Sequence, residues 1–339
     1  MREPPFWWSE RAGIAARVLA PVAMFYGAAA QMRLSRRGHR AAAPVICIGN
    51  LTVGGAGKTP TALMTARMLQ EAGEQPMFLT RGYGGKLAGP VLVEPKQHVA
   101  ADVGDEALLL THAAPTVVAR ARIPGARSAI SAGATVIVMD DGFQNPALRK
   151  DVALLVVDER RGIGNRHVIP AGPLRAPLAA QLARAHALVA VGTPSRGAEV
   201  TAQARMRDLP VFRASLQGDK QFIAALGPGR VLAFAGIGDP EKFFATLSDA
   251  GVSLAATQSF PDHHRYTRAE AQALCKQADH DGLILVTTEK DLVRMRGDDA
   301  VEELAAQAHA LPVALVFDEE HAFKAFLLER LAAAKGSRT

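Results

Sequence analysis

The stretch that decides the fold of this chain is Pro44-Val45-Ile46-Cys47-Ile48-Gly49-Asn50-Leu51-Thr52-Val53-Gly54-Gly55-Ala56-Gly57-Lys58-Thr59. It begins as an apolar, β-branched run typical of a buried strand, continues as a glycine-rich turn, and ends in Lys-Thr at the start of a helix-like segment. Such a turn exposes backbone N–H groups beside the positive end of a helix dipole, and together these bind phosphate groups. The pattern predicts a P-loop for a nucleoside triphosphate, which we expect to bind Thr52, Val53, Gly54, Gly55, Ala56, Gly57, Lys58 and Thr59.

Two side chains of this loop have roles of their own. The Lys58 ammonium can reach the β- and γ-phosphates, and the Thr59 hydroxyl can bind Mg²⁺. The usual P-loop pattern has glycine where Thr52 stands, so an ordinary glycine-rich turn between a strand and a helix is the alternative. The order of the three glycines before Lys-Thr favours the P-loop.

A second segment fits the same nucleotide site. Residues 134–139 form an almost wholly apolar run, as expected of a central parallel strand, and Asp140 and Asp141 follow it directly. An acid at the end of such a strand holds Mg²⁺ in P-loop proteins, directly or through water. The alternative is an acidic turn after a strand. We expect Thr59, Asp140 and Asp141 to form the metal site.

The chain alternates between strand-like and helix-like segments, which predicts an α/β fold with a parallel sheet covered by helices on both faces. Further strands are expected at 76–80, 117–119, 152–157, 187–191, 231–235, 255–260, 283–287 and 313–317, and helices at 59–71, 126–133, 240–249, 267–278 and 322–333. Polar and Gly/Pro-rich sequence at 217–228 suggests a boundary. We therefore expect an N-terminal helix at 1–35, a P-loop core domain at 36–222 and a smaller C-terminal α/β domain at 223–339.

The N-terminal segment has the composition of a membrane-associated helix. Phe6-Trp7-Trp8 contains both tryptophans of the chain, and their amphipathic rings favour a bilayer interface. A mostly apolar run at 13–31 follows, and then an arginine cluster, Arg33, Arg36, Arg37 and Arg40, suited to anionic lipid. The aromatic start argues against a cleaved signal peptide. We favour a helix lying in the interface, and a helix packed on the soluble core is the alternative.

The composition of the chain indicates its class of protein and the kind of partner it binds. With 339 residues, 49% hydrophobic and 21% charged, the chain is globular and long enough for two domains. Its two cysteines, Cys47 and Cys275, lie far apart in apolar surroundings, which indicates a reducing compartment. The net charge of +6 suits anionic partners, but only 5% of residues are aromatic and no basic-aromatic stripe is present, so we expect no nucleic acid partner.

Two polar constellations are candidates for acid–base chemistry. Gly104-Asp105-Glu106 opens a helix-like run, and Phe260-Pro261-Asp262-His263-His264-Arg265-Tyr266 is a dense polar loop after a strand. Phosphoryl transfer to an alcohol needs a positioned base, usually Asp or His. Taken alone, Asp105 is more typical of a helix N-cap and the histidines of a loop. Spacing in the sequence does not bring the two segments together.

The whole chain resembles the tetraacyldisaccharide 4'-kinase family. The motifs that carry the resemblance run in order along the sequence and are far more specific together than the P-loop alone. Beside the P-loop, which extends from Gly49 to Pro60, they are Arg81-Gly82-Tyr83-Gly84, Val103-Gly104-Asp105-Glu106, Asp140-Asp141-Gly142-Phe143-Gln144, Pro170-Ala171-Gly172-Pro173-Leu174-Arg175, Phe234-Ala235-Gly236-Ile237, Phe260-Pro261-Asp262-His263-His264 and Thr287-Thr288-Glu289-Lys290-Asp291.

The resemblance implies ATP- and Mg²⁺-dependent phosphorylation of the 4'-hydroxyl of an acylated glucosamine disaccharide 1-phosphate, at the cytoplasmic face of the bacterial inner membrane. It implies catalytic roles for Asp105, His263 and Lys58. Asp105 is the expected proton acceptor, oriented and tuned by His263, and the reverse assignment stays open because a coupled pair shares its protons. The four arginines Arg81, Arg120, Arg122 and Arg175 are candidates to hold phosphate groups.

The sequence departs from the family pattern at two places. Asn145 stands where the family often has histidine, and Ala176-Pro177 stands where it often has Glu-Pro, so no titrating role is carried over to either place. Neither change touches Lys58 or Thr59. The competing function is a membrane-associated P-loop ATPase switch, although Val53 replaces the additional lysine that those proteins often carry.

Overall fold

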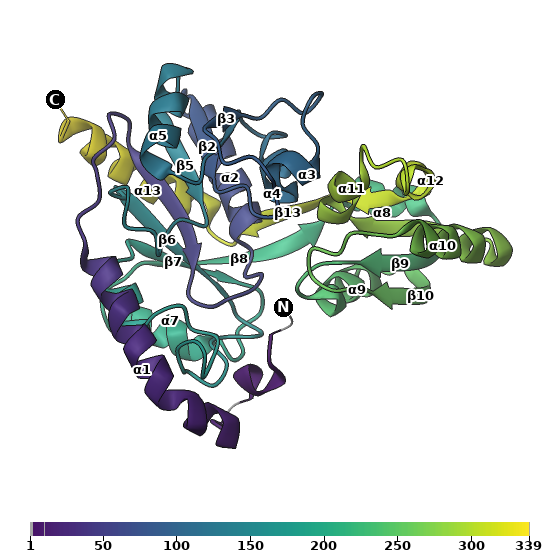
Figure 1. The fold of residues 1–339 in the computed structure, drawn as a ribbon, viewed down its shortest axis with the longest axis horizontal. Coiled ribbons are helices and arrows are strands. Elements are labelled where there is room, and N and C mark those ends of the chain that lie inside the picture. The colour runs from purple at the N-terminus through teal and green to yellow at the C-terminus, as the bar shows by residue number, and fades with distance from the viewer. Residues whose placement is uncertain (1–2, 10, 339) are drawn as a thin grey trace.

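The structure, a computed structural model, describes residues 3–9 and 11–338. It contains a nine-stranded sheet of order β13-β8-β7-β6-β1-β5-β2-β4-β3 and a separate four-stranded sheet of order β10-β9-β11-β12. The two sheets lie at opposite ends of an elongated molecule, and the long helix α1 lies along the outer edge of the larger part (Figure 1). The expected α/β fold with a second, smaller α/β part is confirmed.

The larger sheet is built around β1 (Val45–Asn50), which pairs in parallel with β5 (Val136–Asp140) and β6 (Val152–Asp158). Every residue of these three strands is buried, because helices cover both faces and the strands are apolar and β-branched. The other strands are β2 (Pro76–Thr80), β3 (Val91–Leu92), β4 (Thr116–Val118), β7 (Ala187–Val191), β8 (Val211–Gly218) and β13 (Val313–Phe317). Only the edge pairs β3–β4 and β13–β8 are antiparallel among the described strands.

Helices of small and apolar residues seal the two faces of this sheet. Helices α2 (Lys58–Glu71) and α13 (Glu320–Gly336) contribute to one core cluster. Helices α5 (Arg122–Ser131), α6 (Leu178–Leu182) and α7 (Ala198–Arg205) contribute to the cluster on the other face. The short helices α3 (Ala100–Val103) and α4 (Asp105–Leu110) form a satellite cluster next to β4. The P-loop strand is thus held in the middle of a packed three-layer core.

The smaller sheet is wholly parallel and has its own two-sided core. Its strands are β9 (Arg230–Ala235), β10 (Ser253–Ser259), β11 (Ile284–Thr288) and β12 (His309–Leu311), and its helices are α8 (Lys220–Leu226), α9 (Pro240–Asp249), α10 (Arg268–Asp281), α11 (Glu289–Met295) and α12 (Glu302–Gln307). Phe234 packs with α10 on one face, and Phe243 and Phe244 of α9 pack on the other. The expected capping box Thr267–Glu270 opens α10.

The end of the chain does not belong to the smaller sheet. Strand β13 pairs with β8, and α13 packs on the face of the larger sheet, which differs from the expected domain 223–339. The strand β8, whose residues alternate between apolar and polar, was not expected from the sequence, and it ends where the segment 217–228 begins. We therefore propose that 36–218 and 313–338 form one domain, and that 219–312 is inserted between its last two strands.

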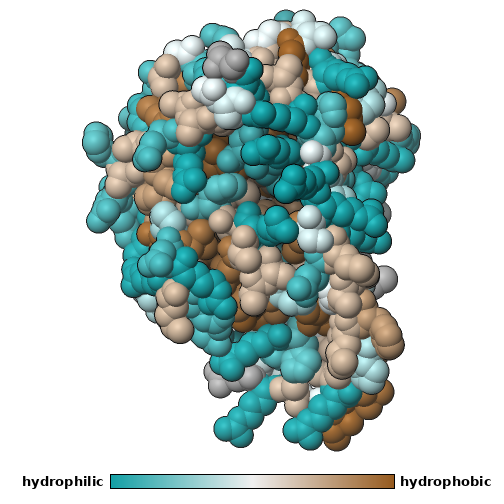
Figure 2. Space-filling model, turned by 90° about the vertical axis from the view of Figure 1, so that its left-hand side faces the viewer, coloured by the Kyte–Doolittle hydropathy of each residue, from teal (hydrophilic) through white to brown (hydrophobic). Residues whose placement is uncertain are grey.

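At the N-terminus, a short 3₁₀ helix (Pro5–Trp8) precedes α1 (Ile14–Ser35), which contacts α6. Small residues of α1 face the protein, and its large apolar side chains are exposed, among them Ile14, Val18, Val22, Met24, Phe25 and Met32. In the described part of the chain, α1 is the one helix long and apolar enough to cross a membrane. Figure 2 views this side of the molecule and shows tan and brown residues gathered in its lower half.

The two tryptophans form hydrogen bonds with the protein through their indole N–H groups. Trp7 Nε1 donates to the carbonyl oxygen of Pro170 at 2.9 Å, and Trp8 Nε1 donates to Glu3 Oε2 at 2.8 Å. The Arg161 guanidinium lies 3.7 Å from the centre of the Trp8 ring and also pairs with Glu3. Both indoles are half-buried. The large exposed apolar side chains at this end of the chain are those of α1.

Candidate active site

The predicted P-loop connects β1 to α2 in the way its glycines require. Gly54 and Gly57 have φ angles of 91° and 94°, which side chains rarely adopt, and α2 begins at Lys58 directly after Gly57. The Asn50 side chain donates to the carbonyl oxygen of Gly54 at 3.0 Å and holds the turn closed. Thr52, the one departure from the usual pattern, lies in an antiparallel bridge with Leu174. The loop therefore exposes its backbone at the N-terminus of a fourteen-residue helix, an arrangement suited to phosphate.

Lys58 and Asp141 face each other beside this loop. Lys58 Nζ lies 3.9 Å from Asp141 Oδ2, and Arg175 donates to both oxygens of the same carboxylate at 2.9 and 3.3 Å. Burial lowers the pKa of Lys58, and the Asp141 charge opposes that effect. Burial raises the pKa of Asp141, but Lys58 and Arg175 outweigh it, so this pKa lies below its usual value. Arg175 also donates from Nε to the carbonyl oxygen of Thr52 at 2.9 Å, which ties the acid to the P-loop.

Asp140 has the geometry of a metal ligand. It is 1% exposed, its Oδ2 accepts a hydrogen bond of 3.3 Å from the Thr59 hydroxyl, and its Oδ1 is buried without a hydrogen-bond partner among the described residues. Burial and the nearby charge of Glu106 raise the pKa of Asp140 to about 7. In the part of the chain that the structure describes, no three His, Cys, Asp or Glu side chains form a metal cluster. A Mg²⁺ ion that binds one or two protein oxygens and completes its shell with phosphates and water fits this donor set.

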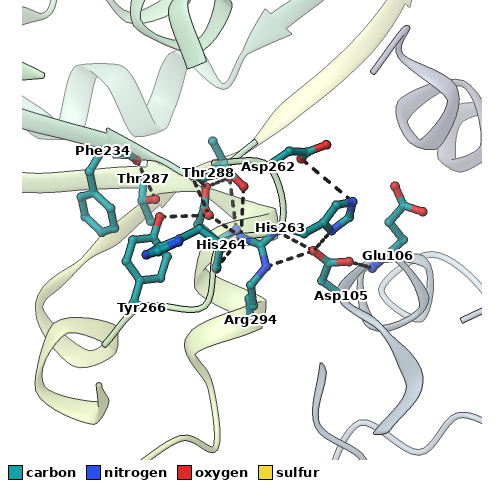
Figure 3. Close-up of polar contacts among 12 residues, drawn as sticks. Asp105, Glu106, Phe234, Asp262, His263, His264, Tyr266, Thr287, Thr288 and Arg294 are labelled. Atoms are coloured by element: carbon teal, nitrogen blue, oxygen red, sulfur yellow. Dashed lines mark hydrogen bonds and ion pairs between the residues drawn. The ribbon is translucent and has the colours of Figure 1, made fainter. Parts of the chain in front are cut away.

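The two polar constellations, separate in the sequence, meet across the two parts of the molecule. Asp105 is the first residue of α4, and His263 lies in the loop after β10 with a φ of 55°. His263 Nδ1 lies 3.1 Å from Asp105 Oδ2, as Figure 3 shows. The backbone N–H of His263 donates to the carbonyl oxygen of Gly236 at 3.0 Å, and the Tyr83 ring lies 5.1 Å from the imidazole. The imidazole is therefore fixed on several sides.

The charges around this pair shift the pKa values of Asp105 and His263 in opposite directions. Burial raises the pKa of Asp105, but the hydrogen bond from His263 and the charges of Arg294 and Lys290 lower it far below its usual value. The same hydrogen bond raises the pKa of His263 above 6.5, against the opposing effect of burial. Asp105 is 4% exposed, so its negative charge is well shielded from water. The pair thus consists of a firmly ionised carboxylate and an imidazole with increased basicity.

Two cationic side chains of α11 join this pair, and sequence reasoning did not assign their roles. Arg294 Nη2 lies 2.6 Å from Asp105 Oδ2, and Lys290 Nζ lies 2.8 Å from Glu106 Oε1. The neighbouring Asp291 accepts hydrogen bonds from Tyr266, Arg294 and the backbone of Gly236. The motif Thr-Thr-Glu-Lys-Asp pointed to these residues, but only their partners on another part of the chain define what they do.

The P-loop and the Asp105–His263 pair belong to one site. A Cβ built on Gly238 would lie 3.4 Å from Asp262 Oδ2 and 3.8 Å from the backbone nitrogen of Gly55, so the loop that carries His263 approaches the P-loop. A cavity of about 420 Å³ adjoins the pair, and Tyr83, Gly104, Asp105, His263, Arg265 and Arg294 contribute to its wall. A small polar group that enters this cavity reaches His263 and Asp105.

The four arginines that were candidates to hold phosphate groups have different surroundings in the structure. Arg175 lies at the P-loop, as described. Arg122 is buried and donates to the carbonyl oxygen of Ala119, and Arg120 donates to the carbonyl oxygens of Gly85 and Lys86, so both support the backbone. Arg81 is exposed. Asn145, at one of the departures from the family pattern, accepts from the N–H of Ala147 at 2.8 Å and stabilises a turn.

Known proteins resemble this chain over almost its whole length. The sequence profile of the family described as tetraacyldisaccharide-1-P 4'-kinase matches residues 15–332. The tetraacyldisaccharide 4'-kinase of Nitrobacter winogradskyi is 50% identical over 332 residues, 98% of either chain. That of Methylobacterium nodulans is 53% identical over 98% of this chain and 96% of its own. The crystal structure of LpxK from Aquifex aeolicus in complex with ATP matches with a TM-score of 0.71 and 24% identity, covering 94% of this chain and all of the other, and supports the fold.

Proposed function

Because the chain belongs to the tetraacyldisaccharide-1-P 4'-kinase family, we propose that its site transfers the γ-phosphoryl group of ATP to the 4'-hydroxyl of tetraacyldisaccharide 1-phosphate, a step of lipid A biosynthesis. The activity is that of a kinase with an alcohol acceptor. The observation that carries the assignment of residues is the 3.1 Å contact between His263 and Asp105 at the wall of a cavity. A phosphate-binding loop beside an imidazole–carboxylate pair has the parts that phosphoryl transfer to an alcohol requires.

The P-loop residues Thr52, Val53, Gly54, Gly55, Ala56, Gly57, Lys58 and Thr59 are the proposed triphosphate site. Their backbone N–H groups and the Lys58 ammonium stabilise the negative charge on the phosphates. Thr59 and the unpaired Oδ1 of Asp140 are the proposed ligands of Mg²⁺, which when bound neutralises charge on the phosphates. Asp141 is paired with Arg175 and Lys58, which supports a role in holding these cations toward the phosphates and makes Asp140 the stronger of the two metal candidates.

His263 is the better proposed proton acceptor of the catalytic pair. Asp105 Oδ2 already accepts hydrogen bonds from His263 and Arg294, and the lowered pKa makes this carboxylate a weak base. Its hydrogen bond to Nδ1 favours the tautomer in which Nε2 is free to accept. As the 4'-oxygen forms its bond to the γ-phosphorus and the bond to the β-phosphate oxygen breaks, the hydroxyl proton moves to Nε2 and ADP leaves. This is the second of the two assignments that the sequence left open.

The lipid acceptor calls for a membrane surface, and α1 is the proposed contact. Its small residues Ala16, Ala23 and Gly27 are buried, and Gly27 lies against Pro177 and Val168 of the larger domain. A helix attached to the protein along one face and apolar along the other suits an interfacial position. We propose that it binds the cytoplasmic face of the inner membrane, with the basic residues that follow it near anionic lipid headgroups.

Transfer of label tests this function directly. The wild type and Lys58→Ala are incubated with γ-³²P-ATP and tetraacyldisaccharide 1-phosphate in detergent micelles, with Lys324→Ala, a change on the distant α13, as the matched control. We expect Mg²⁺-dependent label in the lipid for the wild type and the control, and none for Lys58→Ala. Hydrolysis of ATP by the wild type without label in the lipid would instead support the membrane-associated ATPase switch.

A further inference from the structure

The guanidinium of Arg294 connects the two sides of the active site. It lies on the last turn of α11, its side chain is 7% exposed, and it donates to Asp105 Oδ2 from Nε at 3.2 Å and from Nη2 at 2.6 Å. Its Nη1 donates to Asp291 Oδ1 at 2.7 Å and to the carbonyl oxygens of Gly236 and His264 at 3.1 and 3.2 Å. Figure 3 shows it between the loop of His263 and the start of α4.

We propose that Arg294 is a positioning residue for phosphoryl transfer. It holds the Asp105 carboxylate and the His263 loop in the relative position in which His263 accepts the substrate proton. The inference rests on the proposed function, since it assigns a role within that site. Arg294 touches neither the imidazole nor the phosphate loop among the contacts described, so it acts through Asp105 and through the backbone on either side of His263.

Three of the four groups that accept hydrogen bonds from Arg294, namely Asp105, Gly236 and His264, orient the imidazole. The Gly236 carbonyl oxygen, which accepts from Arg294, also accepts from the N–H of His263, and the His264 carbonyl belongs to the next residue. His263 has a positive φ that non-glycine residues adopt only when their surroundings impose it. Arg294 therefore supports the strained loop on one side and presents its hydrogen-bond partner Asp105 on the other.

Lysine cannot reproduce this arrangement. An ammonium group carries three donors on a flexible stem, while the planar guanidinium has five in a fixed fork. Four acceptors from different parts of the chain, namely Asp105, Asp291, Gly236 and His264, converge on that fork. Asp291 in turn is held by Tyr266 and Thr288. The position thus selects for the shape of the guanidinium as well as for its charge.

Charge and shape can be tested separately because each has its own readout. The charged groups around the pair are Arg294, Lys290, Glu106 and Asp262, whose Oδ1 lies 4.0 Å from His263 Nε2, and Asp291 faces the far side of Arg294. Removal of the Arg294 cation raises the pKa of any acid or base beside it. The acid limb of the pH profile, in which kcat falls as the imidazole is protonated, therefore moves to higher pH in Arg294→Met. Arg294→Lys keeps the positive charge, so its acid limb stays in place, but it lacks the planar fork of donors.

The experiment compares Arg294→Met and Arg294→Lys in the wild type and in Asp105→Asn, with Arg268→Met on the exposed start of α10 as the control. We expect either change to lower kcat at least about tenfold, with a smaller effect on the KM for ATP. In the Asp105→Asn background the further loss from Arg294→Met falls to about twofold or less, since the partner through which Arg294 acts is already gone. Arg268→Met leaves kcat unchanged.

Equal losses in both backgrounds, or an acid limb that stays in place in Arg294→Met, would overturn the proposal. If Arg294→Met does not fold, Arg294→Lys is compared with the wild type instead. The imidazole ¹⁵N chemical shifts of His263 are measured in both proteins, since these shifts report the tautomer without turnover. Unchanged shifts together with normal kcat in Arg294→Lys count against the positioning role. A wild type that transfers no label to the lipid refutes the proposed function itself, and the tautomer measurement still distinguishes that result from a failure at Arg294.

Discussion

The pH dependence of phosphoryl transfer decides which member of the Asp105–His263 pair accepts the proton. The perturbations are His263→Gln and Asp105→Asn. With His263 as the base, the enzyme is active when the imidazole is neutral, so kcat falls as the pH falls through the pKa of His263. The Asp105 carboxylate raises that pKa above 6.5, which places the acid limb of the wild type in an accessible range. With Asp105 as the base, its lowered pKa leaves no limb there.

The two variants have opposite signatures. In Asp105→Asn the carboxylate that raises the pKa of His263 is gone and burial, which lowers it, remains. The acid limb of this variant therefore moves to lower pH while its maximal kcat falls. In His263→Gln the limb that belongs to the imidazole disappears.

The size of the loss follows from the exposure of the two side chains. Removal of a general base costs about 10²- to 10⁴-fold in rate. The His263 side chain is 31% exposed, so water can partly replace it, and we expect about 10²-fold for His263→Gln. That loss corresponds to roughly 3 kcal/mol of activation free energy. Asp105→Asn also leaves the buried Arg294 without its carboxylate partner, so we expect its free energy of unfolding to fall by roughly 1.5–3 kcal/mol.

The assay is label transfer to tetraacyldisaccharide 1-phosphate at saturating ATP, Mg²⁺ and lipid, between pH 5 and 9. Phosphate groups titrate near pH ~6, and the profile of His263→Gln provides the correction for ATP itself. A wild-type profile that matches that of His263→Gln in shape, or an Asp105→Asn limb displaced to higher pH, would refute His263 as the proton acceptor. Near-normal kcat in both variants would remove the pair from the mechanism altogether.

Three further predictions concern the metal, the membrane and stability. Asp140→Asn replaces one carboxylate oxygen by an amide and should raise the Mg²⁺ concentration for half-maximal activity at least about tenfold, measured by Mg²⁺ titration at fixed ATP; an unchanged midpoint would exclude Asp140 as a ligand. Phe25→Asp, at a side chain 81% exposed, should weaken binding to anionic vesicles by at least about 2 kcal/mol in a sedimentation assay, and the similarly exposed Met206→Asp on the soluble part should not. Phe234→Ala, at a fully buried position of the smaller sheet, should cost about 3–5 kcal/mol of unfolding free energy in urea melts, and a loss below about 1 kcal/mol would contradict the packing described.

Features encoded within one segment could be predicted from the sequence. The P-loop and the apolar strand that ends in Asp140 are each a continuous run, and their pairing in a parallel sheet is confirmed. The capping box at Thr267 is equally local. In contrast, β8 was missed because its half-buried, alternating residues lack the continuous apolar run of the central strands. Without β8, the return of β13 to the larger sheet could not be expected either.

The contact between the two residues of the catalytic pair could not be predicted from the residues alone. Asp105 and His263 are 158 residues apart, and only the family resemblance linked them before the structure brought them together. Arg294 had no signal of its own, since an arginine in the last turn of a short helix is ordinary. The sequence likewise does not reveal that Pro170 and Glu3 accept hydrogen bonds from the two tryptophan N–H groups.

The position of the site follows from the direction of the strands in both sheets. In parallel α/β sheets, ligands bind beyond the carboxyl ends of the strands. The P-loop follows β1 and Asp141 follows β5 in the larger sheet, while Gly238 follows β9 and His263 follows β10 in the smaller one. A Cβ built on Gly238 would lie 3.8 Å from the backbone nitrogen of Gly55, so the carboxyl ends of the two sheets face each other.

Because the carboxyl ends of the two sheets face each other, charged side chains meet across the interface between the larger and the smaller part. Asp158 pairs with Lys242 and Arg160 with Asp239 on one side of the P-loop, and the α11 cations pair with Asp105 and Glu106 on the other. Each pair joins a residue of the larger part to one of the smaller part, so the geometry of the catalytic pair depends on how the two parts are held together. A triphosphate at the proposed P-loop site would add negative charge next to Lys58 at this interface. We therefore expect the binding of ATP to affect the alignment of His263.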